Sequence, residues 1–267
     1  MNWQRAAILA LQACDPRQKC SLVHDLWRRN SDGQLSPVEQ CLAPDQPGRP
    51  PRPLLVTPTQ VPRRRLGSEA GRAALVHAVA HIEFNAINLA LDAALRFPNM
   101  PAEYYHDWLS VAEDEARHFE LLSARLADMH VAYGDLPAHN GLWEMAEATA
   151  HDPLLRMALV PRVLEARGLD VTPGMIERLQ GAGDTATVSA LRVILHEEER
   201  HVAIGSRWFV YLCEQRALPP EQTFIDLLET HYRGQIAGPF NLDARRRAGF
   251  SSAEMARLCE LQPANNR

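Results

Sequence analysis

The segment LRVILHEEERHVAIGSRWFVYL, residues 191–212, has the apolar periodicity of an α-helix, interrupted by two ionisable residues. At helical steps, one side of this stretch is apolar or glycine, apart from Glu198 and His201. These two residues stand three apart and therefore share a helix face. A carboxylate and an imidazole thus interrupt a stripe that should face a protein core. The residues of this stripe are Leu191, Ile194, Glu198, His201, Gly205, Trp208 and Leu212.

A second segment, EDEARHF at residues 113–119, repeats the pattern. Glu115 and His118 stand at the same three-residue step. Their helical stripe is otherwise apolar. Its other members are Trp108, Val111, Leu122 and Met129.

Each of these pairs follows another glutamate at nearly the same distance. Glu83 precedes Glu115 by 32 residues, and Glu165 precedes Glu198 by 33. Glu83 is the only charged residue in its helical stripe, whereas Glu165 shares its stripe with Arg162. The chain therefore reads as a duplicated helix hairpin in which each half carries Glu and then Glu-x-x-His.

This donor set predicts a site for two metal ions. A buried lone carboxylate would take up a proton, and four buried carboxylates together repel one another. Two divalent cations cancel those charges, and two imidazoles complete the coordination. Glu115 and Glu198 are the candidate bridging ligands, and Glu83 and Glu165 are candidate terminal ligands. The six predicted metal ligands are Glu83, Glu115, His118, Glu165, Glu198 and His201.

Several neighbouring residues could serve either at the metal site or elsewhere in the structure. His77, His81 and His196 are possible extra ligands, but they lie off the glutamate stripes. Arg117 and Arg200 occupy matching places in the two halves and either pair with ligand carboxylates or lie on the surface. Tyrosines could serve radical chemistry but more often pack; these are Tyr104, Tyr105 and Tyr211.

Helical periodicity dominates the chain and predicts an all-α fold. Four long helices are expected near 68–96, 101–130, 152–167 and 184–216. The connection at 131–151 is the longest, as in a ferritin-like four-helix bundle with one long crossover. We expect residues 1–66 to form N-terminal helices and a Pro-rich arm along the bundle, 67–218 the bundle, and 219–267 a helical tail.

Composition narrows the function classes. The formal net charge of −5 argues against an electrostatically driven nucleic-acid partner, and the clusters Arg63–Arg65 and Arg245–Arg247 read as solvated surface. Five cysteines without CxxC spacing suggest reduced thiols and a cytoplasmic protein. They are Cys14, Cys20, Cys41, Cys213 and Cys259. No apolar run reaches the ~18 residues of a membrane span.

The chain resembles the ferritin-like di-iron carboxylate superfamily, and within it the bacterial domain-of-unknown-function-455 family. The matching segments are HIEFNAINLALD (81–92), EDEARHF (113–119), EARGLDVTP (165–173), EEERHVAIG (197–205) and the PFN..AR..AGF pattern (239–250). The resemblance implies a ferritin-like bundle. Other members of that superfamily are tRNA-modifying hydroxylases, fatty-acid desaturases and ribonucleotide reductase subunits.

The leading hypothesis is an oxidoreductase that activates dioxygen at two iron ions and oxidises or hydroxylates a substrate. Manganese, or one manganese with one iron, would suit the same ligands. The alternatives are iron handling as a ferroxidase or storage protein, and a non-enzymatic protein with a structural metal. We expect a monomer or small homo-oligomer with an electron donor and no membrane contact; a tRNA substrate is left open by analogy only.

Overall fold

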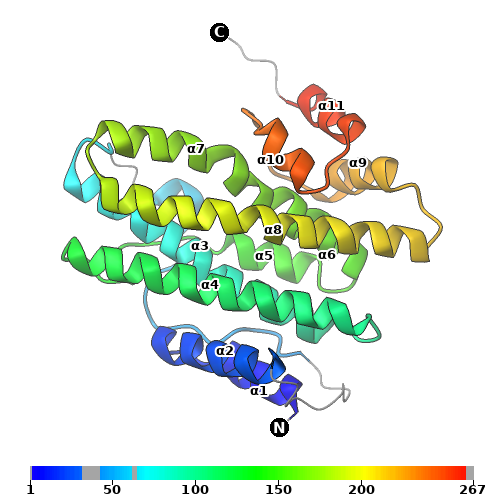
Figure 1. Ribbon diagram of the computed structural model, residues 1–267, viewed down its shortest axis with the longest axis horizontal. Helices are drawn as coiled ribbons and strands as arrows, with labels where there is room; N and C mark the ends of the chain where they lie inside the picture. Colours follow the sequence, from blue (N-terminus) through cyan, green and yellow to red (C-terminus); the bar gives the residue numbers. More distant parts are fainter. Residues whose placement is uncertain (1, 32–42, 62–64, 263–267) are drawn as a thin grey trace. The chain divides into compact units, whose positions relative to one another are not determined.

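The computed structural model (Figure 1) describes residues 2–31, 43–61 and 65–262. Within these residues every regular element is a helix, which confirms the all-α prediction and is consistent with a helical bundle. The elements are α1 Trp3–Gln12, α2 Pro16–Ser31, η1 Pro58–Gln60, α3 Glu69–Arg96, α4 Ala102–Asp128, α5 Gly141–Ala148, α6 Pro153–Leu159, η2 Val160–Glu165, α7 Ala166–Gly181, α8 Thr185–Gln215, α9 Pro220–His231, α10 Leu242–Arg247 and α11 Ser252–Glu260.

The chain divides into two compact units. The first comprises Met1–Glu144 and Leu179–Ala190, and the second comprises Met145–Arg178 and Leu191–Arg267. Helices α5, α7 and α8 each contribute residues to both units. Each unit combines separate segments of the chain, whereas the expected division was into three consecutive parts: N-terminal part, bundle and tail. The expected division therefore stays a prediction.

Helices α3 and α4 form the centre of the first unit and run side by side (Figure 1). Both begin and end close to the positions expected from sequence. The length and composition of α3 would let it cross a membrane, but most of its apolar part is buried inside the protein. This is the expected property of the core helix of a soluble protein. Helices α1 and α2 pack against α3 and α4.

The described part of the Pro-rich arm, residues 43–61, lies along the first unit as expected. Two backbone hydrogen bonds help to attach it: Gly48 N–H donates to the carbonyl of Leu11 at 2.8 Å, and Val56 N–H donates to that of Ala138 at 2.8 Å. Two apolar side chains of the arm contribute little to this attachment, since Leu54 and Leu55 are 62% and 43% exposed.

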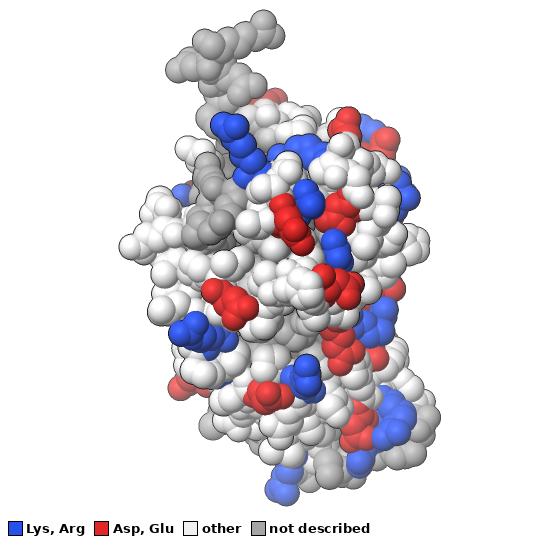
Figure 2. All heavy atoms as spheres, turned by 90° about the vertical axis from the view of Figure 1, so that its left-hand side faces the viewer, with Lys and Arg blue, Asp and Glu red and all other residues white. Residues whose placement is uncertain are grey.

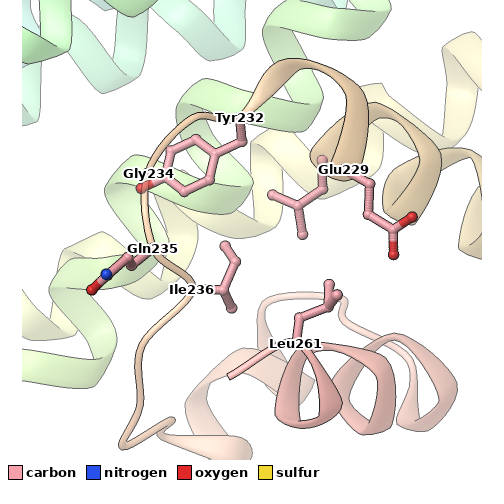
Figure 3. Close-up of a pocket in the computed structure, with 7 residues that line it drawn as sticks. Glu229, Tyr232, Gly234, Gln235, Ile236 and Leu261 are labelled. Atoms are coloured by element: carbon pink, nitrogen blue, oxygen red, sulfur yellow. The ribbon is translucent and has the colours of Figure 1, made fainter. Parts of the chain in front are cut away.

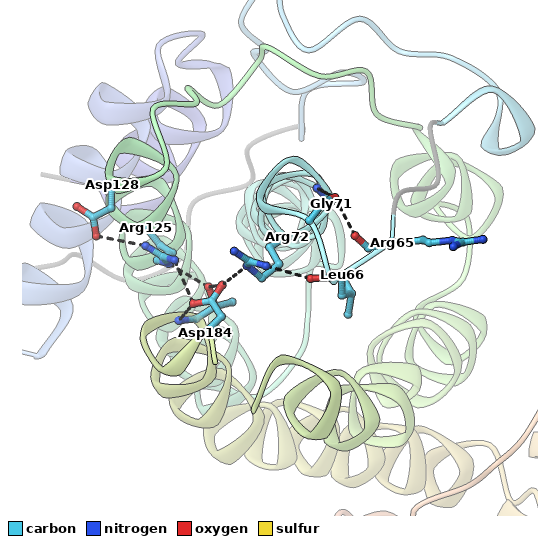
Figure 4. Close-up of polar contacts among 9 residues, drawn as sticks. Arg65, Leu66, Gly71, Arg72, Arg125, Asp128 and Asp184 are labelled. Carbon is cyan, nitrogen blue, oxygen red and sulfur yellow. Dashed lines mark hydrogen bonds and ion pairs between the residues drawn. The ribbon is translucent and has the colours of Figure 1, made fainter. Parts of the chain in front are cut away.

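Asp184 ties the start of α8 to the ends of α3 and α4 (Figure 4). Its carboxylate accepts hydrogen bonds from the backbone N–H and the hydroxyl of Thr187, which caps the helix N-terminus. The same carboxylate pairs with Arg125 at 3.0 Å and with Arg72 at 3.5 Å. The beginning of α8 is therefore fixed by one buried acidic side chain.

In the second unit, α6, η2 and α7 follow one another without a break. The prediction that the third helix stops before Gly168 is therefore wrong, because helical structure continues to Gly181. It continues through Pro173, which cannot donate to the carbonyl of Leu169. The side-chain amide of Asn241 donates to that carbonyl instead, at 3.2 Å, and so removes part of the cost of the proline.

The tail helices α9, α10 and α11 belong to the second unit; α9 contacts α6 and α11. Helix α10 was not expected from the sequence. Its Arg245 corrects the reading of the cluster Arg245–Arg247 as solvated surface, because Arg245 is 4% exposed and pairs with Asp170 at 2.7 Å. Of the other arginine cluster, residues 63 and 64 lie outside the described residues.

Charged side chains of both signs are interspersed on the face shown in Figure 2. That face has no broad area of one sign of the kind that nucleic-acid-binding proteins present. The four cysteines within the described residues, Cys14, Cys20, Cys213 and Cys259, are free, and Cys41 lies outside those residues.

Candidate metal centre

The first unit brings Glu83, Glu115 and His118 together. Nδ1 of His118 lies 3.3 Å from Oε2 of Glu83 and 3.4 Å from Oε2 of Glu115. Each of the three offers one possible ligand atom, and these atoms lie within 4.8 Å of one another. All three residues are buried, with exposed fractions of 2%, 0% and 0%. Two carboxylates and an imidazole at this spacing can hold a metal ion.

The helices explain why these groups are buried. The stripe of α4 predicted from sequence is buried throughout: Trp108, Val111, Leu122 and Met129 are buried together with the two ligand candidates. On α3, every residue from Glu83 to Leu95 is buried, so Glu83 stands at the start of the fully buried part of its helix. The low exposure follows from where the apolar residues stand in the sequence.

Burial and like charge set the electrostatics of this group. Burial, together with the negative charge of Glu115, raises the pKa of Glu83 to about 8. Burial alone would lower the pKa of His118, but contacts with Glu115 and Glu83 and their negative charges raise it to about 12. In the absence of a metal, protons thus supply the positive charge that the two carboxylates require.

The second unit holds the other three predicted ligands. On α8, Nδ1 of His201 lies 3.8 Å from Oε2 of Glu198, and the two residues are 0% and 9% exposed. The other residues of the predicted stripe of α8 are buried as well. Glu165 is the last residue of η2; it is half-buried, and its Oε2 atom is buried. That all six residues converge on one centre stays a prediction.

The segment that presents Glu165 is a π-helix. Ala166 N–H donates to the carbonyl of Pro161, five residues earlier, which is the π-helical hydrogen bond. Pro161 lacks the N–H that would continue the α-helical pattern, which favours the wider turn. Short π-helical turns occur frequently at functional sites.

Gly205 lets η2 approach α8 closely. A Cβ atom at Gly205 would lie 2.3 Å from both Cβ and Cγ of Pro161, a distance that no real packing tolerates. Gly205 stands four residues after His201 on the ligand-bearing side of α8. The glycine that interrupts the predicted stripe is therefore where η2 and α8 touch within the second unit.

The alternative ligands have other roles in the structure. Nε2 of His77 accepts from Gly134 N–H at 2.9 Å. The ring of His81 bonds to the hydroxyl of Tyr133 at 2.9 Å and to the carbonyl of His139 at 3.2 Å. These bonds dock the segment after α4 onto α3. His196 is exposed.

The remaining side chains with two possible roles are two arginines and three tyrosines. Arg117 and Arg200 are exposed, and Arg117 pairs with Asp114 on the surface of α4. Tyr104 and Tyr105 donate to the carbonyls of Ala93 and Phe97, and Tyr211 packs edge-on against Trp208. The sequence reading missed Tyr133, which stacks on His77 with ring centroids 5.5 Å apart. It stands in a segment without helical periodicity, so no pattern marks it.

Two cavities lie away from the predicted ligands. One of about 250 Å³ in the second unit is lined mainly by apolar side chains of α9 and the segment after it, with Tyr232 and Glu229 (Figure 3). The other, in the first unit beside His81 and Tyr133, measures about 20 Å³, about the room that one water needs. Neither includes a residue of the predicted metal centre.

Comparison with known proteins places the chain in a family. Residues 12–256 match the family model described as "Protein of unknown function (DUF455)". The chain belongs to this family. It is also 43% identical over 276 residues to a protein of Haemophilus influenzae named "Uncharacterized protein", covering 97% of this chain and 94% of the relative. No solved structure matches the chain. The family assignment confirms the resemblance to the domain-of-unknown-function-455 family, while membership of the ferritin-like superfamily stays a prediction.

Proposed function

We propose that this DUF455 protein is a ferritin-like, two-metal carboxylate protein that oxidises a substrate with dioxygen. In this proposal, Glu83, Glu115 and His118 of the first unit hold the metals together with Glu165, Glu198 and His201 of the second unit. The observation that carries the proposal is the buried group in the first unit, combined with the repeated Glu and Glu-x-x-His pattern in the second.

The residues present fit a pair of divalent cations. Four carboxylates and two imidazoles match the donor set that iron and manganese prefer. The raised pKa of Glu83, caused by burial and by the charge of Glu115, marks a place where positive charge is needed. A cation would replace the protons held there, as metal binding commonly does.

When bound, the reduced metal pair would supply the electrons that activate dioxygen. The chain's own residues contribute placement and exclusion of water. Glu115 and Glu198 are the proposed bridging carboxylates, and Glu83 and Glu165 the terminal ones. The apolar residues around Glu115 and His118 limit access of water to the centre.

An enzyme is favoured over a storage protein because much of the chain lies outside the four long helices. The arm and the tail pack on the helical units and offer material for the walls of a substrate pocket. We propose iron as the native metal, with manganese or a mixed pair as alternatives. An unidentified substrate, an electron donor and a cytoplasmic location complete the proposal. A tRNA substrate rests on analogy alone.

Iron titration in air tests the proposal. The purified protein, checked by size-exclusion chromatography, is given increasing ferrous iron with oxygen present. We expect a monomer or small oligomer that retains about two irons per chain, shows one stable absorption change, and binds no more. Uptake of hundreds of irons per assembly, or a large hollow oligomer, would favour storage. No retained iron at all would contradict the proposed site.

A further inference from the structure

Arg162 is a fully buried charge three residues before Glu165. It belongs to η2 and is 1% exposed. Its Nη2 donates to Oε1 of Glu254 at 2.7 Å, and Glu254 is itself 4% exposed. A buried arginine is costly unless it is paired and hydrogen-bonded, so its presence inside the second unit requires an explanation.

Three phenylalanine rings enclose the guanidinium. Its central carbon lies 4.2 Å from the ring centroid of Phe224, 4.5 Å from that of Phe250 and 4.6 Å from that of Phe209. All three distances are within the range of cation–π attraction. Within the described residues, Nε and Nη1 of Arg162 have no hydrogen-bond acceptor, so the rings and Glu254 together hold this charge.

The partners of Arg162 come from separate elements of the second unit. Phe209 belongs to α8, Phe224 to α9, and Phe250 precedes α11. Glu254 lies in the first turn of α11, where its other oxygen accepts from Ser251 N–H at 2.8 Å in a capping box. Arg162 therefore joins η2 to the ligand-bearing helix α8 and to the tail.

The contacts of Arg162 with Glu254 and the three phenylalanine rings act on the π-helical turn of η2. A π turn takes one more residue than an α turn, and one residue of an α-helix turns by about 100°. The sequence placed Glu165 and Arg162 on one α-helical stripe. Because the π turn is wider, Glu165 points in a different direction from the one that this stripe predicts. Pro161 packs against Gly205, and Arg162 is held by Glu254 and the three phenylalanine rings. Two consecutive residues therefore fix η2.

We propose that Arg162, held by Glu254 and the three phenylalanine rings, is a positioning residue that fixes the η2 turn and thereby sets the direction of Glu165. The tail helices α9 and α11 are then part of the metal centre's support, not an appendage. This inference rests on the proposed function, because it assigns Glu165 as a metal ligand. Supporting residues of this kind commonly change metal affinity by roughly 10- to 100-fold.

Cobalt(II) titration of the full chain tests the inference, because the visible bands of cobalt(II) report the ligand set. The variants are Glu254→Gln, which keeps the shape but removes the charge, and Arg162→Lys, which keeps the charge but loses the planar guanidinium. We expect the wild type to bind two equivalents. In both variants one equivalent should weaken by roughly 10- to 100-fold with an altered spectrum.

Asp170→Asn is the matched control. Asp170 is buried and pairs with Arg245, so it also joins the tail to the rest of the second unit, but through α7. The Asp170→Asn variant should have a lower melting temperature, while the binding of both cobalt equivalents and their spectrum stay unchanged. The positioning role would be overturned if Glu254→Gln and Arg162→Lys both bound cobalt as the wild type does. It would also be overturned if Asp170→Asn lost one equivalent as well. A wild type without two equivalents would overturn the proposed function instead.

Discussion

At the residue scale, the contacts of Glu83 and His118 make the metal-free protein sensitive to pH. Both groups have a folded-state pKa above the usual value, so the folded state binds more protons than the unfolded state between about pH 4.5 and 12. Their contribution to stability is full at low pH. It is lost as pH rises, first through the pKa of about 8 of Glu83.

We therefore expect the free energy of unfolding of metal-free protein to fall by on the order of a few kcal/mol between pH 5 and pH 8. Urea unfolding at both pH values measures this. Glu83→Gln, which cannot ionise, should flatten the dependence and stabilise the metal-free protein at pH 8. Glu177→Gln, at an exposed position of α7, should leave it unchanged. A wild type that gains stability over this range would contradict the assigned proton uptake.

Gly205 offers a second test at the residue scale. Gly205→Ala would push a methyl group into Pro161, and such overpacking costs about 1–3 kcal/mol. Thermal unfolding should show the loss. The control is Gly174→Ala in α7, where a Cβ meets nothing within 4 Å. Because alanine favours helix, this control should gain about 0.5–1 kcal/mol. Equal behaviour of the two variants would mean that the close approach of Pro161 to Gly205 is absent.

At the element scale, Asp184 should stabilise the start of α8 in two separable ways. Asp184→Asn keeps a capping oxygen but loses the charge that pairs with Arg125 and Arg72, whereas Asp184→Ala loses both. We expect the alanine variant to be less stable than the asparagine variant by about 0.5–2 kcal/mol in urea unfolding. Asp128→Ala is the control: Asp128 is 72% exposed and 3.8 Å from Arg125, so its effect should stay within about 0.5 kcal/mol. Equal losses at Asp184 would show that the cap contributes nothing.

The long helices could be predicted because their apolar stripes recur at helical spacing. The first, second and fourth end close to where the sequence placed them. The third did not, because Gly168 and Pro173 act as stop signals in an isolated sequence. In the folded protein, Asn241 of the tail donates to the carbonyl of Leu169 and so removes part of the cost of continuing the helix through Pro173. Helix α10 is too short for periodicity to identify.

The sequence predicted more of the candidate site than of the fold around it. Glu83, Glu115 and His118 were marked by standing alone in apolar stripes, and burial of those stripes brings them together. The role of Arg162 could not be predicted. Its partners Glu254 and Phe250 lie about ninety residues further along the chain, and the π turn that separates its direction from that of Glu165 has no signature beyond Pro161.

At the scale of the whole molecule, metal should stabilise the fold, because the folded state presents a preformed group of ligands and the unfolded chain does not. With manganous ion at about 100 times its Kd, we expect the melting temperature to rise by roughly 5–10 °C. Glu198→Ala should abolish the rise. Its neighbour Glu199 is a surface residue paired with Arg247, so Glu199→Ala should keep it. If all three proteins respond alike, the ion binds elsewhere.

We propose that two half-sites, one in each unit, form a single two-metal centre. Anomalous diffraction from crystals of the manganese-loaded protein tests this most directly, because it locates the metals and their ligands together. We predict two anomalous peaks about 3.5–4 Å apart, with Glu115 and Glu198 bridging them and Glu83, His118, Glu165 and His201 completing their coordination. A loaded crystal in which Glu115 and Glu198 point to different surfaces, or in which metal contacts the residues of one unit alone, would contradict the account.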